Sequence, residues 1–114
     1  MQRVTEKTRI SIIRHLAEIM PTIHTTFGVI RIGLFGSVIR GEQTNTSDVD
    51  ILVKLKDEYK TLKNYVALVD YLESFFDSKV DLVTLESLDP YIRPYILNEV
   101  VWIEGSPDLS EAYS

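Results

Sequence analysis

The segment from Val29 to Phe35 constrains the fold of this chain more strongly than any other. It is apolar and rich in β-branched residues, and Arg31 is its one charged residue. This composition is typical of a strand that is largely buried, because a strand with one solvent-facing side alternates polar and apolar residues. Gly36 and Ser37 end the run abruptly, and Val38–Arg40 is long enough for one helical turn. We therefore predict a buried strand that leads through a glycine turn into a short helix.

A helix is expected to precede this strand. Apolar residues recur at helical spacing from Ile10 to Met20 and predict an amphipathic helix. Pro21 is expected to interrupt it, because proline lacks the amide hydrogen that the helix ladder needs. A second short helical stretch would then run to Phe27, and Gly28 would stop it.

Strands and helices alternate along the rest of the chain. Residues 42–47 are polar and predict a loop, and residues 48–55 alternate as in a strand with one acidic end. The further elements that we predict are a helix over 60–77, a strand over 79–85, a helix over 89–99 and a short strand over 100–103. The order α-β-α-β-α-β-α-β predicts an α/β (α+β) fold, a small mixed β-sheet flanked by helices. We assign residues 1–104 to one domain and residues 105–114, which are mostly polar, to a flexible tail.

The composition of the chain disfavours two classes of function, nucleic-acid binding and membrane association. The chain has 114 residues, a formal net charge of −5 and no cysteine. Proteins that bind nucleic acid non-specifically carry a basic face, so the charge disfavours DNA or RNA as a partner. The apolar runs are too short to cross a bilayer, and we expect a cytoplasmic protein without a membrane partner.

Two acidic residues indicate a metal site. Asp48 and Asp50 are two residues apart on a predicted strand, so their carboxylates lie on one face. Two like charges at this spacing repel each other, and a divalent cation between them relieves the repulsion. Magnesium prefers oxygen ligands and usually keeps water and substrate phosphate among them. Taken alone, such a pair more often marks a solvated strand end than a site.

A third acid follows on the next predicted strand. Asp81 lies between the apolar residues Val80 and Leu82, so it faces away from the core. If the two acidic strands pair, Asp81 lies beside Asp48 and Asp50, and the three carboxylates could hold two metal ions. Asp81 is then the natural base for an attacking hydroxyl, or the ligand of the ion that activates it.

The turn upstream of the acids supplies groups that suit a phosphate. Gly36 lets the backbone come close to an anion, and the Ser37 hydroxyl adds a donor. Arg40 lies one helical turn on and could reach a phosphate oxygen. Ser47 directly precedes Asp48 and is either a loop cap or a residue that supports the site from behind. Gly36, Ser37 and Arg40 are therefore candidates for a phosphate site, although a Gly-Ser pair alone also fits a turn or a helix cap.

These residues resemble a known family. The stretch GSVIRGEQTNTSDVDILV matches the G-S-x10-D-x-D signature of the DNA polymerase β-like nucleotidyltransferase superfamily, and Asp81 in KVDLV matches its third carboxylate. From Ile10 to Glu104 the chain resembles the minimal nucleotidyltransferase (MNT) antitoxins of prokaryotes, through GLFGS, Arg40-Gly41, SDVD and PYIRPYILNEVVWI. Ile39 departs from the pattern, because a small residue is common before the arginine.

The resemblance implies an activity, a cofactor and a partner. It implies that Asp48, Asp50 and Asp81 bind Mg²⁺, with two ions expected, and that ATP is the substrate. It also implies that the nucleotide-binding residues are Gly36, Ser37, Arg40 and Ser47. It further implies transfer of AMP to a protein hydroxyl, a tyrosine of a HEPN-type ribonuclease toxin encoded nearby. The chain would then act as the antitoxin of a type VII toxin–antitoxin system.

Two alternatives stay open. One is an enzyme that modifies a small hydroxylated molecule such as an aminoglycoside, with a homodimer building the cleft. The other is an antitoxin that neutralises its partner by binding alone. The presence of all three acids and of the Gly36–Ser37 turn argues against the second alternative.

Overall fold

A four-stranded mixed sheet forms the centre of the computed structural model, which describes residues 8–42 and 48–103. Its strands are β1 (Val29–Phe35), β2 (Val49–Leu55), β3 (Val80–Thr84) and β4 (Val101–Trp102), in the spatial order β3-β2-β1-β4. Strand β1 is antiparallel to β2 and β4, whereas β2 and β3 are parallel. The predicted fold class and the order of elements are confirmed. Ser47 and the predicted tail over 105–114 lie outside the described residues.

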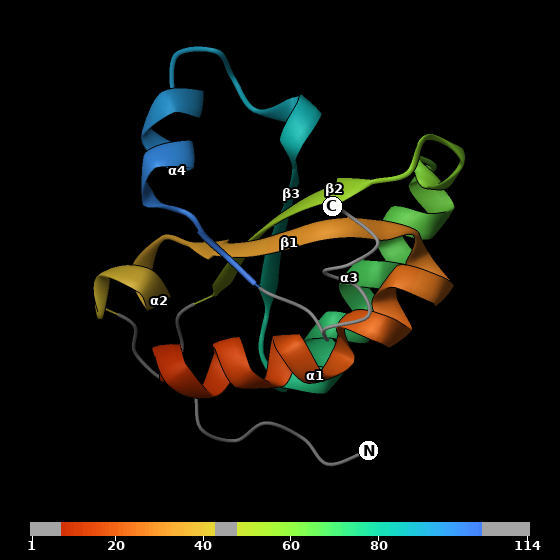
Figure 1. The fold of residues 1–114 in the computed structure, drawn as a ribbon, viewed down its shortest axis with the longest axis horizontal. Helices are drawn as coiled ribbons and strands as arrows, with labels where there is room; N and C mark the ends of the chain where they lie inside the picture. Colours follow the sequence, from red (N-terminus) through yellow and green to blue (C-terminus); the bar gives the residue numbers. More distant parts are fainter. Residues whose placement is uncertain (1–7, 43–47, 104–114) are drawn as a thin grey trace.

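Helices lie on both sides of this sheet (Figure 1). Helices α1 (Arg9–Phe27) and α3 (Leu62–Phe76) cover one face, and α4 (Arg93–Glu99) lies on the other side. The single turn α2 (Ser37–Arg40) follows β1, and the 3-10 turns η1 (Asp57–Tyr59) and η2 (Leu85–Ser87) follow β2 and β3. Within the described ranges, no helix has the length and apolar character that a membrane span requires.

The predicted break at Pro21 is wrong, because α1 runs without interruption from Arg9 to Phe27. A proline inside a helix removes one hydrogen bond and costs about 3 kcal/mol. Buried residues on both sides of the proline, among them Met20 and Ile23, keep one face of the helix against the core. Packing therefore outweighs the local penalty. The predicted stop is confirmed, since Gly28 is left-handed at φ 70° and its amide donates to the His24 carbonyl.

Helix α4 begins later than the predicted start at Asp89. The Asp89 side chain accepts the amide hydrogen of Tyr91 at 2.8 Å, which forms a side-chain turn instead of a first helical turn. The amides of Ile92 and Arg93 then donate to the Asp89 carbonyl.

The main core lies between the sheet and the two long helices. Its fully buried members come from α1, β1, β2 and α3 and include Ile12, Leu16, Ile23, Ile32, Ile51, Leu68, Leu72 and Phe76. The opposite face of β2 is covered as well, since Leu52 is fully buried there outside the main cluster. Strand β2 is thus fixed from both sides, and it carries the central carboxylate of the site.

Helix α3 allows a direct test of this packing. We expect Leu72→Ala to lower the free energy of unfolding by about 2–5 kcal/mol, because it empties a fully buried position. Leu62→Ala is the matched control, since Leu62 is 79% exposed on the same helix and such a change usually costs about 0.5 kcal/mol or less. Urea unfolding of both variants measures the difference. Equal losses would contradict the assignment of this core.

Candidate functional site

Three chain segments meet at one end of the sheet. Because β1 and β2 are antiparallel, the end of β1 lies beside the start of β2, and Phe35 pairs with Asp50. Because β2 and β3 are parallel, their starts also lie together, and Asp50 pairs with Asp81. The amide of Val49 donates to the carbonyl of Lys79 at 2.9 Å and fixes this end of the two strands. The two acidic strands thus pair, which was the condition for Asp81 to lie beside Asp50, and the turn at Gly36 lies next to them.

Asp50 packs directly against the turn that follows β1. Gly36 has φ 76° and ψ −149°, a backbone conformation that residues other than glycine rarely adopt. A Cβ atom on Gly36 would overlap Oδ2 of Asp50 and lie 2.8 Å from its Cγ. The backbone amide of Ser37 donates a hydrogen bond to the Asp50 carboxylate. Gly36 therefore makes room for a protein carboxylate here, a role that the sequence did not indicate.

The charges of the acids act on one another. Partial burial and then the negative charge of Asp81 raise the pKa of the half-buried Asp50, and the charge of Asp48 adds a smaller effect. The amide of Ser37 and the positive charge of Arg40 oppose that rise. Among the described residues, burial and like charge therefore outweigh the groups that compensate the charge of Asp50. A cation at this end of the sheet would add to that compensation.

Asp48 and Asp81 differ from Asp50 in their surroundings. Both are exposed, Asp48 immediately before β2 and Asp81 on the outer side of β3. Among residues 8–42 and 48–103, no three acidic or histidine side chains are arranged as a group that could hold a metal ion. The predicted three-carboxylate cluster is therefore not preformed, although the paired strands bring its members to the same end of the sheet.

Arg40 does not point freely toward a ligand in this structure. Its Nε donates to Glu42 at 2.6 Å, and its NH1 donates to Glu99 at 2.7 Å. These two carboxylates hold the guanidinium, and the bond to Glu99 connects α2 with α4. Sequence reasoning missed both partners. Glu42 is two residues from Arg40, but nothing in the sequence signals a contact with Glu99, which is 59 residues away.

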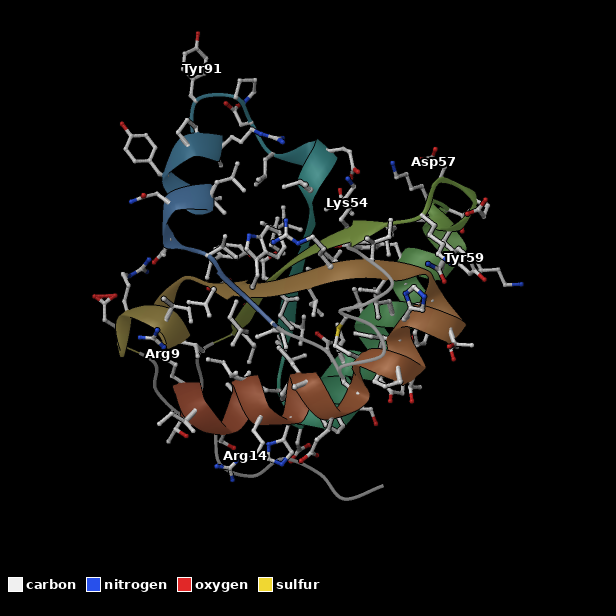
Figure 2. All side chains as sticks on the ribbon, in the orientation of Figure 1. Arg9, Arg14, Lys54, Asp57, Tyr59 and Tyr91 are labelled. Atoms are coloured by element: carbon white, nitrogen blue, oxygen red, sulfur yellow. The ribbon has the colours of Figure 1, made fainter. Side chains whose placement is uncertain are left out.

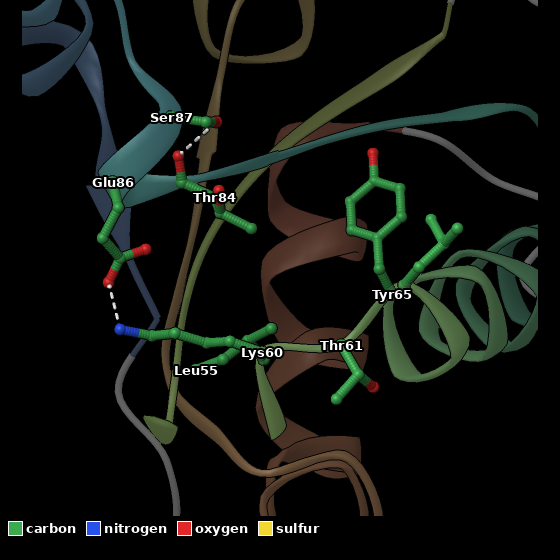
Figure 3. A pocket seen from close by; sticks show the side chains of 8 residues that line it. Leu55, Lys60, Thr61, Tyr65, Thr84, Glu86 and Ser87 are labelled. Atoms are coloured by element: carbon green, nitrogen blue, oxygen red, sulfur yellow. Dashed lines mark hydrogen bonds and ion pairs between the residues drawn. The ribbon is translucent and has the colours of Figure 1, made fainter. Parts of the chain in front are cut away.

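A cavity lies at the opposite ends of β2 and β3 (Figure 3). It has a volume of about 380 Å³, and Lys60 forms an ion pair with Glu86 across it at 3.2 Å. Leu55 and Thr84, at the far ends of their strands, contribute to its walls. None of the predicted site residues lines this cavity. The paired acidic strand ends, where the charges of Asp81 and Asp48 act on Asp50, are therefore a better candidate than the cavity.

Comparison with known proteins agrees with this geometry. The family model of the nucleotidyltransferase domain matches residues 13–103. The curated relative "Protein adenylyltransferase MntA" of Thermococcus cleftensis is 46% identical over 77 residues, which are 68% of this chain and 77% of that protein.

Solved structures share the fold. A structure assigned to a candidate minimal nucleotidyltransferase has a TM-score of 0.70 and 31% identity, and the match covers 82% of this chain and 94% of that one. A toxin–antitoxin structure with AMP-PNP has a TM-score of 0.61 and 28% identity, over 92% and 79% of the two chains. A complex of tri-AMPylated Shewanella oneidensis HEPN toxin with MNT antitoxin has a TM-score of 0.54 and 26% identity, over 92% and 76%.

The contact between Gly36 and Asp50 generates a mutational prediction. Gly36→Ala should destabilise the fold by about 1–3 kcal/mol, because of the backbone conformation and the overlap with Asp50. Gly41→Ala is the control: Gly41 also has positive φ, at 73°, but a Cβ there meets nothing within 4 Å. In a double-mutant cycle with Asp50→Ala, we expect the cost of Gly36→Ala to shrink. Additive costs in urea unfolding would show that the two residues do not interact.

The raised pKa of Asp50 predicts a pH dependence. In the folded state its carboxyl ionises less readily than in the unfolded state, where the pKa is about 3.9. Without divalent cations, this residue's contribution to the free energy of unfolding should fall as the pH rises from below 3.9 through the folded pKa. Asp50→Asn should remove that part of the slope. Urea unfolding in EDTA across this range, compared between protein and variant, checks it, and an unchanged slope in the variant would contradict it.

Proposed function

Because this chain belongs to the nucleotidyltransferase domain family, we propose that it transfers AMP from ATP to a hydroxyl of a protein. The observation that carries the proposal is the strand register that sets Asp50 beside Asp81 and next to the Gly36–Ser37 turn. The name of the MntA relative supports a protein as the acceptor. The complex of an AMPylated HEPN toxin with an MNT antitoxin supports a HEPN-type toxin as the partner. That this toxin is a ribonuclease and that the acceptor group is a tyrosine hydroxyl are parts of the proposal itself. In this proposal the chain acts as an antitoxin.

The nucleotide would lie at the turn between β1 and α2. Gly36 leaves the backbone without a side chain there, and the Ser37 hydroxyl can donate to a phosphate oxygen. Arg40 can join them only if it exchanges Glu42 or Glu99 for phosphate, which offers arginine the same kind of charge-assisted, bidentate hydrogen bonds. A role for Ser47 stays a prediction.

Magnesium fits the donor chemistry of this site. Asp50 and Asp81 present carboxylate oxygens from paired positions, and Asp48 adds a third carboxylate near them. Magnesium typically binds one or two carboxylates and completes its shell with water and phosphate, so a preformed group of three ligands is not required. Bound here, the ion would supply the positive charge that offsets repulsion among these carboxylates and the triphosphate. We assign Asp48, Asp50 and Asp81 as its ligands, with two ions expected.

Asp81 is suited to activate the acceptor. Its exposed side chain is accessible from outside the sheet, so an acceptor on another protein can reach it. In the proposed step, Asp81 takes the proton of the acceptor hydroxyl, whose oxygen forms a bond to the α-phosphorus of ATP. The bond from that phosphorus to the β-phosphate oxygen breaks, and pyrophosphate leaves. The attached AMP adds negative charge and bulk to the toxin, and both oppose the entry of RNA.

The test combines this chain, the HEPN protein encoded beside it, labelled ATP and Mg²⁺. We expect the toxin to gain one or more AMP units on tyrosine and to lose its ribonuclease activity after this chain is removed. Asp48→Asn/Asp50→Asn should abolish transfer, whereas Asp57→Asn/Asp70→Asn, which removes two exposed carboxylates elsewhere, should not. Asp81→Asn should slow transfer by about 10²–10⁴-fold while the affinity for ATP changes much less.

Other outcomes would identify the alternatives. Full transfer in EDTA, or in the Asp48→Asn/Asp50→Asn variant, would overturn the proposed chemistry. An unmodified toxin that is inhibited only while this chain is bound would indicate neutralisation by binding alone. Transfer to an aminoglycoside but to no protein would place the chain among enzymes that modify small molecules.

A further inference from the structure

The sheet face that carries Asp50 and Asp81 also carries a basic cluster at its other end. Arg31 on β1 pairs with Lys54 on β2, so the two cationic side chains emerge side by side, and both are exposed. Lys54 is four residues from Asp50 on the same strand, which places both on one face. Figure 2 labels Lys54 on the side of the sheet where α4 lies. One face of the sheet is thus acidic at one end and basic at the other.

An aromatic ring holds Arg31 in place. The centre of its guanidinium lies over the Trp102 ring, 3.9 Å from the ring centroid. Trp102 pairs with Gly33, where a Cβ would come within 3.0 Å of the indole, so the ring lies close to the sheet. A guanidinium stacked on an aromatic ring keeps its N–H groups directed outward in its own plane. Arg31 is therefore oriented before any ligand arrives.

Neither cation is neutralised within the described part of the chain. No carboxylate among residues 8–42 and 48–103 forms an ion pair with Arg31 or Lys54. Two acids of the described part that lie toward this end are already engaged, because Lys60 contacts Asp57 at 2.9 Å and Glu86 at 3.2 Å. Lys54 acts on Asp57 only as a weaker, more distant charge. Like charges directly opposite each other on paired strands destabilise a sheet, and an anion between them removes that cost.

The distance along β2 separates this basic cluster from the nucleotide site proposed at Gly36 and Ser37. Four residues of strand span about 13 Å, so Lys54 lies roughly that far along β2 from Asp50. A triphosphate held at Gly36 and Ser37 occupies the acidic end. The basic pair therefore suits a different anion on the same face.

We infer that Arg31 and Lys54, with Arg31 stacked on Trp102, form a second phosphate subsite that binds a nucleotide phosphate other than the triphosphate of the reacting ATP. That the ligand is a nucleotide rests on the proposed function; that the cluster binds an anion rests on the pairing and the stacking alone. The phosphate can come from an AMP already attached to the acceptor or from a second free nucleotide. In the first case the subsite would retain a modified acceptor for further additions.

Binding is measured first, without catalysis. Trp102 is the only tryptophan of the chain, so its fluorescence reports on Arg31 directly. In EDTA, the dinucleotide ApA, which has one phosphodiester and no triphosphate, should give a saturable change. Arg31→Gln/Lys54→Gln should weaken ApA binding at least about tenfold, measured by calorimetry because the substitution also changes the signal of Trp102. Arg14→Gln/Lys63→Gln removes the same charges from exposed positions on α1 and α3 and should leave the affinity unchanged.

The subsite inference would be overturned if both double variants bound ApA like the original protein. A glutamate-rich peptide that bound this cluster more tightly than ApA would also overturn it, in favour of carboxylates of the acceptor. The proposed function is judged separately, by transfer of the first AMP. If Arg31→Gln/Lys54→Gln loses ApA binding but still transfers the first AMP normally, both conclusions are supported. If the original protein binds ApA but transfers no AMP, only the proposed function is rejected.

Intact masses of the acceptor distinguish the two sources of phosphate. If the subsite holds an AMP already attached, Arg31→Gln/Lys54→Gln should leave the first addition within about twofold and slow the later ones at least about tenfold. If it holds a free nucleotide, added AMP should compete with ApA for binding. The rates of the first and of the later additions should then change by the same factor in Arg31→Gln/Lys54→Gln. A slower first addition combined with unchanged ApA binding would overturn both versions.

Discussion

The carboxylate of Asp50 lies against the Gly36–Ser37 backbone and opposite Asp81, and the arrangement of this end of the protein depends on that position. Only a glycine leaves room for the carboxylate, and among the described residues the amide of the next residue and the distant Arg40 are the groups that offset its charge. Buried residues on both faces hold β2 in place, with Val49, Ile51 and Val53 on one face and Leu52 on the other. The fold thus holds a carboxylate where its charge is poorly compensated, and this is a reason to expect a cation there.

The contacts of Arg40 connect the turn that follows β1 with helix α4. Glu99 lies at the end of α4, so its bond to Arg40 joins the element beside the turn to the helix that lies on the same face of the sheet. A phosphate that attracted Arg40 would compete with this bond. Under the proposed function, a nucleotide at the turn would thus act on α4 through one side chain, by the same charge-assisted bonding that makes arginine suitable for phosphate.

Periodicity was sufficient to predict most elements. The strand Val29–Phe35 was predicted at its observed bounds, and the stop at Gly28 is confirmed, because both depend on local chemistry. The break at Pro21 and the early start at Asp89 were wrong for opposite reasons. At Pro21, packing overrode a local penalty, and at Asp89 a side-chain hydrogen bond overrode the expected helix. Patterns within one segment do not show whether core packing outweighs a proline penalty, or whether a side-chain hydrogen bond replaces the first helical turn.

The sequence by itself determined the kind of chemistry available: a glycine turn after a buried strand, two acids on one strand and a third acid on another. Spacing within a strand decides which side chains share a face, and that information is local. The tertiary structure alone decided that Asp50 pairs with Asp81, that Gly36 makes room for a carboxylate, and that Arg40 contacts Glu99. It also set Arg31 opposite Lys54 and over Trp102. These contacts join residues far apart in the chain, and their register follows from the packing of the whole sheet rather than from any one segment.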